Sequence, residues 1–312
     1  MAELVKIRGA ASGYQEVLET LLTKGRHQQS RNGATIEIED FVIELADPMQ
    51  AVLGSARPGY NEAIGAVEGL QLVAGISDSS LTCEIQPNFR AFMDDGKFWG
   101  AYGPRTVDQF PIITERLRLD PDTRQAVITL WDPEFDAKGG KQDHPCTTAF
   151  NFRIRGGRLS MTTFMRSNDG YWGWPYDVYQ FAMVQTTMAH VLGVQLGTYT
   201  HHAASFHLYE PHWEIAKAIV DGDPYSDNPK HVLGFRPQPQ PWTSPTTGEE
   251  HRSTRITWED ARDSARRVWH VVRGVAAADT LVGGAEISYA KMLMDRKLKT
   301  ATANRAKLDS RR

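Results

Sequence analysis

Four kinds of reactive or polar side chain follow one another in the middle of this 312-residue chain. A thiol can act as a nucleophile, an arginine can bind a phosphate, a polar side chain can read a base, and a His/Tyr pair can bind a sugar. The residues that supply these groups are Cys146, Arg166, Ser167, Asp177, His207 and Tyr209. Their order in the chain indicates a site for a pyrimidine nucleotide.

Cys146 follows Pro145 and opens a segment that we expect to fold as a hairpin over 146–167, turning at Gly156-Gly157. Addition of a thiolate to pyrimidine C6 makes C5 nucleophilic, which requires an activated thiol. The hairpin can fold Arg166 back toward Cys146, and a nearby cation lowers a thiol pKa from its usual ~8.5. A small buried side chain is the commoner role of a cysteine, and we expect that role for Cys83.

Asp177 bears on the choice of base. Uracil presents an N3–H donor and an O4 acceptor, which suit an amide, whereas cytosine presents an N4 amino donor and an N3 acceptor. A carboxyl group accepts from N4, and one shared proton can bridge it to N3. Asp177 therefore favours cytidylate. It could equally be a helix N-cap, because a mostly apolar helix is predicted over 177–192, closed by Gly193.

The chain resembles the thymidylate synthase family, and in its base-reading residue it is similar to the deoxycytidylate 5-hydroxymethylase branch. The family's Gln-Arg-Ser-x-Asp stands here as Met165–Asp169, its Gly-x-Pro-Phe-Asn as Gly173–Asp177, and its Asp-x-His-x-Tyr as Ser205–Tyr209. The resemblance runs from about residue 14 to about 215 and is strongest over 120–212. The last hundred residues do not match the family.

This resemblance implies a set of nucleotide ligands. Arg31, Arg166 and Ser167 would bind the phosphate, and His207 and Tyr209 the sugar. Arg124 would reach the phosphate in the partner subunit, which implies a homodimer with shared sites. The family's second arginine at that place is Gln125 here.

The resemblance also implies a folate co-substrate. 5,10-Methylenetetrahydrofolate would supply the one-carbon unit, Asp169 would face the pterin, and Glu68 would organise proton transfer to and from the base. In the loop 77–103 we nominate the aromatic residues Phe89, Phe92 and Trp99 as folate contacts.

The fate of the one-carbon unit distinguishes two products: hydride transfer gives methyl, and water capture gives hydroxymethyl. Thr147 stands where synthases usually have His, and the C-terminus KLDSRR differs from the short apolar end of methyl-forming relatives. We therefore expect a dCMP 5-hydroxymethyltransferase. The alternatives are a dCMP C5-methyltransferase, a CMP 5-hydroxymethylase, and a catalytically silent binding or scaffold protein.

Composition limits the remaining possibilities. The net charge of −3 argues against a general polyanion binder. The two cysteines have neither disulfide nor metal-ligand spacing, so we expect no metal site. Because no signal peptide or membrane-spanning apolar run is apparent, we expect a cytoplasmic protein, in the host cytoplasm if it is phage-encoded.

The hydrophobic periodicity predicts an α+β fold with a mixed sheet, and the family resemblance implies that this sheet packs against its twin in a homodimer. Helices are expected over 14–25, 60–74 and 109–119, and strands over 36–45, up to 131, and near 195–201 and 205–209. We place a catalytic domain at 1–235 and a proline-rich linker with a helical, basic extension at 236–312. In that extension Thr257 should cap a helix ending at Gly274, and 285–300 could form another. The basic tail 291–312 is expected to be a solvated terminus, or else a contact for protein or nucleic acid.

Overall fold

The computed structural model describes residues 2–227, 241–243, 250–252, 255–282 and 284–309. An eight-stranded mixed sheet forms its centre, in the order β1-β3-β8-β6-β5-β4, with β2 paired to β3 and β7 to β8. The pairs β1/β3, β6/β8 and β7/β8 are parallel and the others are antiparallel. The strands are β1 Glu3–Ile7, β2 Arg26–Ser30, β3 Gly33–Leu45, β4 Val127–Thr129, β5 Thr147–Arg155, β6 Arg158–Met165, β7 Asn168–Asp169 and β8 Gln195–Tyr209. The predicted α+β fold with a mixed sheet is confirmed.

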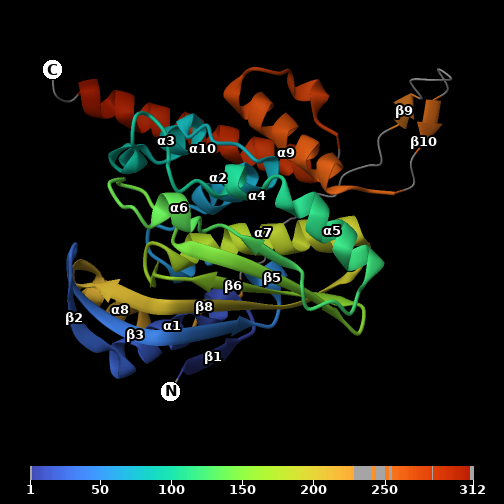
Figure 1. Cartoon of the computed structure of the whole chain (residues 1–312). Coiled ribbons are helices and arrows are strands. Elements are labelled where there is room, and N and C mark those ends of the chain that lie inside the picture. The colour runs from blue at the N-terminus through green and yellow to red at the C-terminus, as the bar shows by residue number, and fades with distance from the viewer. Residues whose placement is uncertain (1, 228–240, 244–249, 253–254, 283, 310–312) are drawn as a thin grey trace.

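Ten α-helices are described, and most of them lie around this sheet (Figure 1). They are α1 Ala10–Lys24, α2 Glu62–Ala74, α3 Ser80–Ile85, α4 Tyr102–Thr106, α5 Gln109–Leu119, α6 Pro133–Asp136, α7 Trp174–Leu192, α8 Trp213–Val220, α9 Trp258–Arg273 and α10 Gly284–Asp309. In Figure 1, α7 runs between the sheet and a layer formed by α2, α9 and α10. Among the described residues, no helix is both long and apolar enough to cross a membrane.

Helix α7 is central because it is apolar on nearly every side and is buried over almost its whole length. Two glycines of α2 allow that helix to approach α7 closely. A Cβ atom at Gly65 would lie 2.8 Å from Cβ of Tyr179, and one at Gly69 would lie 2.9 Å from Sδ of Met183. This approach places the α2 face that carries Glu68 beside the first turns of α7.

The hairpin β5–β6 forms as predicted, and its turn residues Gly156 and Gly157 have φ values of 55° and 71°. Only glycine adopts this conformation freely, which matches a tight two-residue turn. Two strand predictions were wrong. The segments 195–201 and 205–209 are one continuous strand, β8, because its pairing with β3 persists through Ala203 and Ser205. The strand expected to reach 131 ends at Thr129.

The described part of the C-terminal extension packs on the rest of the chain. Thr257 caps α9 in a reciprocal capping box with Asp260, and Gly274 ends the helix at φ 75°, both as predicted. The Trp258 ring stacks on Phe110 of α5 with centroids 4.0 Å apart. Helix α10 is longer than predicted and continues to Asp309, so most of the basic tail is helical. The proposed boundary at residues 235 and 236 and most of the proline-rich segment lie outside the described residues.

Candidate active site

A cavity of about 350 Å³ lies where α2 and the start of α7 meet the segment that precedes β5. Cys146, Glu68 and Asp177 all line it. These three come from segments far apart in the sequence, and the structure brings them together as the sequence prediction requires. The described residues include no group of three or more His, Cys, Asp or Glu side chains arranged to hold a metal ion.

Cys146 is half-buried immediately before β5, and the hairpin returns Arg166 to it. The backbone N–H of Arg166 donates to the carbonyl of Cys146 at 2.8 Å, and Nη2 of Arg166 lies 3.7 Å from Sγ. Nε of Arg166 donates to the carbonyl of Pro145 at 3.0 Å, which fixes the guanidinium. Burial raises the pKa of the Cys146 thiol above its ordinary value and outweighs the lowering by Arg166. The expectation that Arg166 would lower the net pKa of the Cys146 thiol was therefore wrong.

Asp177 is buried in the first turn of α7, with 9% of its surface exposed. Oδ2 accepts from Nδ2 of Asn168 at 2.6 Å, and Oδ1 accepts from Nε2 of Gln180 at 2.9 Å. Burial raises the pKa of this carboxyl to about 7, although both amide donors lower it. The alternative role as N-cap was wrong, because α7 begins at Trp174 and Gly173 is its N-cap.

Glu68 lies on α2, half-buried at the cavity wall. Burial raises the pKa of its carboxyl to about 8, and the negative charges of Asp177 and Asp143 raise it further. Near neutral pH this group is therefore mostly protonated and can donate a proton. Two carboxyl groups with shifted pKa values beside a thiol are typical of a functional site.

A second polar group lies along the sheet. The β7/β8 register places Asp169 opposite His207, and the ring of His207 lies 5.0 Å from that of Tyr209 in an edge-to-face arrangement. Burial lowers the pKa of His207, so this ring is neutral near pH 7. Ser167 is half-buried between β6 and β7. Asp169 accepts from the backbone N–H groups of Tyr171 and Trp172 at 2.7 and 3.1 Å, which shapes the turn leading into α7.

Two predicted phosphate ligands lie away from the cavity wall. Arg31 is exposed in the two-residue turn between β2 and β3. This turn lies close to the start of β3, where Thr35 pairs with Tyr209. Arg124 is exposed in the loop before β4. The structure thus gathers Cys146, Glu68 and Asp177 around the cavity and His207 and Tyr209 on the sheet beside Asp169, while Arg31 and Arg124 remain at the surface.

The opposite cavity wall is aromatic. Phe89, Phe92 and Phe98 line it, and Phe92 is 55% exposed. Phe89 and Phe92 were nominated from the sequence. Trp99 lines a separate recess, and Phe98 takes its place at the cavity.

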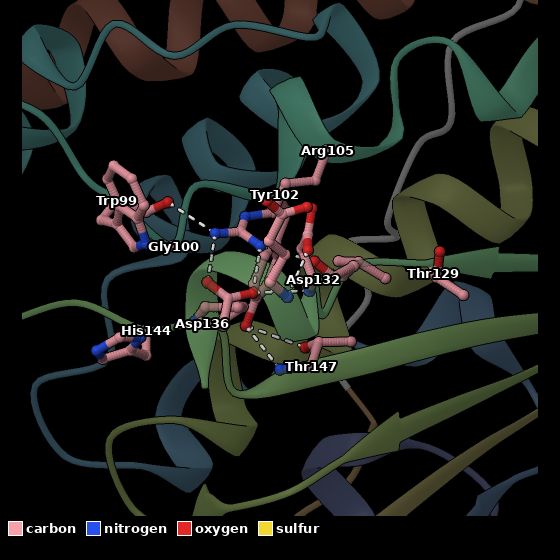
Figure 2. Close-up of polar contacts among 12 residues, drawn as sticks. Trp99, Gly100, Tyr102, Arg105, Thr129, Asp132, Asp136, His144 and Thr147 are labelled. Atoms are coloured by element: carbon pink, nitrogen blue, oxygen red, sulfur yellow. Dashed lines mark hydrogen bonds and ion pairs between the residues drawn. The ribbon is translucent and has the colours of Figure 1, made fainter. Parts of the chain in front are cut away.

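Arg105 and Tyr102 of α4 hold the segment next to this wall in place (Figure 2). Arg105 makes a bidentate ion pair with the buried Asp136, with N–O distances of 2.6 and 2.8 Å, and also donates to the carbonyl of Trp99 at 3.1 Å. At the start of the same helix, the hydroxyl of Tyr102 lies 3.0 Å from Oγ1 of Thr147, the first residue of β5. The Tyr102–Thr147 hydrogen bond therefore fixes the cavity-lining segment 100–103 relative to Cys146, and the Arg105 ion pair ties the same segment to α6.

Sequence reasoning missed the residues that hold Asp177. Asn168 is the variable position of the Arg-Ser-x-Asp motif, and Gln180 lies one helical turn after Asp177. The i, i+3 spacing of Asp177 and Gln180 on a predicted helix was the available signal. For Asn168 the sequence carried no such signal.

Comparison with known proteins agrees with this geometry. The family model described as thymidylate synthase matches residues 85–243. A protein named deoxyuridylate hydroxymethyltransferase from Bacillus phage SP01 is 31% identical over 63% of this chain and 56% of its own length. The protein of that name from Pseudomonas phage M6 is also 31% identical, over 67% of this chain and 62% of its own length. A putative thymidylate synthase of Methanothermobacter marburgensis is 28% identical over 70% of this chain and 99% of its own length. The chain thus spans less than two thirds of either phage relative. The match over half of the chain, together with the site described above, shows that the chain belongs to the thymidylate synthase family.

Proposed function

We propose that this chain is a deoxycytidylate 5-hydroxymethyltransferase that uses 5,10-methylenetetrahydrofolate as one-carbon donor. The observation that carries the proposal is the position of Asp177. Its carboxyl group is buried in the same cavity as the Cys146 thiol. A further polar pair, His207 and Tyr209, lies on β8.

Cys146 is the nucleophile in this proposal. Its thiolate adds to C6 of the base, the S–C6 bond forms, and the electron pair of the C5–C6 double bond makes C5 nucleophilic. Arg166, 3.7 Å from Sγ, stabilises the thiolate against the cost of burial. A phosphate bound by Arg166, Ser167 and Arg31 would position the nucleotide for this attack.

Asp177 reads the base and activates it. One oxygen accepts from cytosine N4–H, and a single proton is shared between the carboxyl group and N3. A proton on N3 withdraws electrons from C6 and favours attack by Cys146. Because Asn168 and Gln180 already donate to both oxygens, the carboxyl group is fixed in orientation before the base arrives.

The aromatic wall fits the proposed co-substrate, since a flat heteroaromatic ring can pack against Phe89, Phe98 and the exposed Phe92. When bound there, the folate supplies a one-carbon unit at the oxidation level of formaldehyde. Asp169, at the turn leading into α7, is the proposed polar contact to the pterin. The half-buried Glu68 can hold and deliver a proton near neutral pH because its pKa is raised to about 8.

In this proposal the one-carbon unit on C5 captures water rather than hydride. Thr147, where family synthases usually carry His, is buried and donates to the hydroxyl of Tyr102, and Tyr102 and Gln71 present polar groups at the cavity wall. Gln71 is held in place by Asp78 and Thr82. These polar side chains can hold a water molecule beside C5. The proposal includes a homodimer in which the exposed Arg124 reaches the partner's phosphate site.

A second candidate is a deoxyuridylate hydroxymethyltransferase, which the names of the two phage relatives favour. A protonated carboxyl group carries one donor and one acceptor, so protonated Asp177 could also pair with O4 and N3–H of uracil. The preferred base then depends on where the shared proton resides. Cytosine N3 is basic and accepts that proton, whereas uracil O4 is only weakly basic, which favours dCMP when Asp177 is ionised.

The test is mass spectrometry of the product formed from dCMP, dUMP and CMP, each with methylenetetrahydrofolate. A gain of CH2O on dCMP supports the proposal, and a gain on dUMP alone would support the second candidate. A gain of CH2 with dihydrofolate would indicate a methyltransferase, and a product from CMP alone would indicate a ribonucleotide enzyme. If none of the three nucleotides reacts, the chain is a silent binding relative.

A further inference from the structure

We propose that His201 is a positioning residue that fixes the side-chain amide of Asn168, so that the amide donates to Asp177 and favours cytosine over uracil. The base preference in this statement rests on the proposed function. The geometry of the relay does not depend on it and can be tested separately.

The relay is a chain of hydrogen bonds beneath the cavity. The hydroxyl of Tyr199 lies 2.9 Å from Nδ1 of His201, and Nε2 of His201 lies 2.9 Å from Oδ1 of Asn168. Nδ2 of Asn168 then donates to Oδ2 of Asp177 at 2.6 Å. Tyr199 and His201 are completely buried, and Asn168 is 4% exposed. Water therefore has little access to replace any of these contacts.

The chemistry of the groups fixes the direction of every donor. An ionised carboxylate only accepts, so Asn168 must turn Nδ2 toward Asp177 and Oδ1 toward His201. His201 must then donate from Nε2. Burial lowers the pKa of His201 to about 3, so the ring is neutral, carries one N–H, and accepts from Tyr199 at Nδ1. All three donors point toward Asp177, which stabilises its charge against burial.

Loss of His201 would free the Asn168 amide to rotate. An Asn168 oxygen facing Asp177 would require a proton between the two, and would therefore stabilise the protonated carboxyl group. The protonated Asp177 can pair with uracil as well as with cytosine. When Asp177 is ionised, the shared proton must reside on N3 of the base, and only cytosine N3 can accept it. The relay therefore lies outside the cavity but sets the base preference inside it.

The first test measures the tautomer of His201 directly. Long-range proton–nitrogen NMR of the full chain with 15N-labelled histidine should show His201 neutral, with its proton on Nε2. The signal is assigned by its disappearance in His201→Gln. A proton on Nδ1, or a charged ring near neutral pH, would overturn the proposal because the donors would no longer point toward Asp177.

The second test measures kcat/KM for dCMP relative to dUMP. His201→Phe keeps a ring of similar size but removes both nitrogen atoms, and we expect the dCMP:dUMP ratio to fall about tenfold. Asn168→Leu should lower the ratio similarly, and adding His201→Phe to it should cause no further fall, because His201 acts through Asn168. His201→Gln, which can still donate to Asn168, should retain most of the preference.

His202→Phe is the matched control. It makes the same substitution one residue along β8, on the opposite face, where His202 is half-buried and contacts Phe164 and Asp40. We expect the ratio to stay unchanged there. If His201→Phe lowered turnover of both nucleotides equally, its role would be structural only and the proposal would fail. Absence of any product in the wild type would overturn the proposed function, and the tautomer measurement would still decide the relay.

Discussion

Nη2 of Arg166 lies 3.7 Å from Sγ of Cys146, yet the thiol pKa remains above its ordinary value. Burial outweighs the arginine, and the nearby carboxyl groups of Asp177 and Asp143 act in the same direction as burial. A protonated Asp177 or Asp143 would withdraw that opposition, since a neutral carboxyl group does not disfavour a thiolate. The protonation of Asp177 and the ionisation of Cys146 are therefore linked.

Cys146→Ala should abolish turnover, because no other thiol lines the cavity among the described residues. We expect a fall in kcat of at least about a thousandfold, with dCMP affinity changed little, since the substitution removes one atom that acts only in the covalent step. Kinetics and calorimetric titration with dCMP separate the two effects. Cys83→Ala is the control, because Cys83 is buried against Met93 and should leave kcat unchanged. Retained turnover in Cys146→Ala would remove the covalent mechanism.

Asp177→Asn should shift the preference toward dUMP. An amide held with its NH2 toward O4 and its oxygen toward N3–H pairs with uracil, and in that orientation it meets N4–H of cytosine with a donor and N3 with an acceptor. We expect the dUMP:dCMP ratio of kcat/KM to rise at least about a hundredfold. Asn168 and Gln180 both donate to this position, so the Gln180 amide must rotate to accept from the new NH2 group. A variant that still strongly prefers dCMP would show that Asp177 does not read the base.

The sequence allowed the proximity of Cys146 and Arg166 to be predicted because it depends on residue type and local order. Pro145-Cys146 and Arg166 lie at the two ends of one hairpin, so a correct turn at Gly156-Gly157 was enough to bring them together. Glu68 was found as a carboxyl group among apolar helix residues, where an unpartnered acid is unusual, and Asp177 was found by its match to the family's Gly-x-Pro-Phe-Asn motif.

The relay behind Asp177 could not be predicted in the same way. The β7/β8 register pairs Asn168 with Phe206, five residues from His201, so the contact between the His201 ring and the Asn168 amide depends on side-chain packing across the sheet. Tyr199 reaches His201 from two residues away on the same face of β8. The pKa of Cys146 was predicted in the wrong direction because burial depends on packing from distant elements. The start of α7 was misplaced by three residues because Trp174-Pro175-Tyr176 carries no periodic signal of its own, although proline is common in a first helical turn.

Glu68→Gln should stabilise the protein at alkaline pH. The folded-state pKa of Glu68 is about 8, above the ordinary 4.5, so the folded state binds the proton more tightly than the unfolded state does. Stability from this group is fully present below about pH 4.5 and is lost as the pH rises through 8. Denaturant unfolding should therefore show Glu68→Gln to be more stable than wild type at pH 9 by about 1–3 kcal/mol, after allowance for the open cavity.

That difference should disappear well below pH 4.5, where Glu68 is protonated in both the folded and the unfolded state. A stability difference for Glu68→Gln that is constant with pH would contradict the raised pKa.

Trp258→Ala tests how firmly the C-terminal extension is attached. The ring of Trp258 is 1% exposed and stacks on Phe110, so its removal leaves a large cavity between α9 and α5. We expect a loss of about 3–5 kcal/mol in the free energy of unfolding. Ile287→Ala is the control, because Ile287 on α10 is 53% exposed and its loss should cost less than about 0.5 kcal/mol. A separate early transition in wild-type unfolding, abolished by Trp258→Ala, would show that the extension folds independently.

Mixing two inactive variants tests the shared site. If Arg124 binds the phosphate in the partner subunit, Arg124→Ala and Cys146→Ala damage different components of each site. A mixed dimer then contains one site that lacks both residues and one that has both. Equal amounts, denatured and refolded together, should recover about a quarter of wild-type activity, because half of the dimers are mixed and each has one intact site of two. Arg155→Ala is the control and should be active alone. Arg155 is an exposed arginine at the end of β5, and it pairs with Asp122 on the loop that carries Arg124. No recovery on mixing, with Arg124→Ala inactive by itself, would place Arg124 in the site of its own subunit.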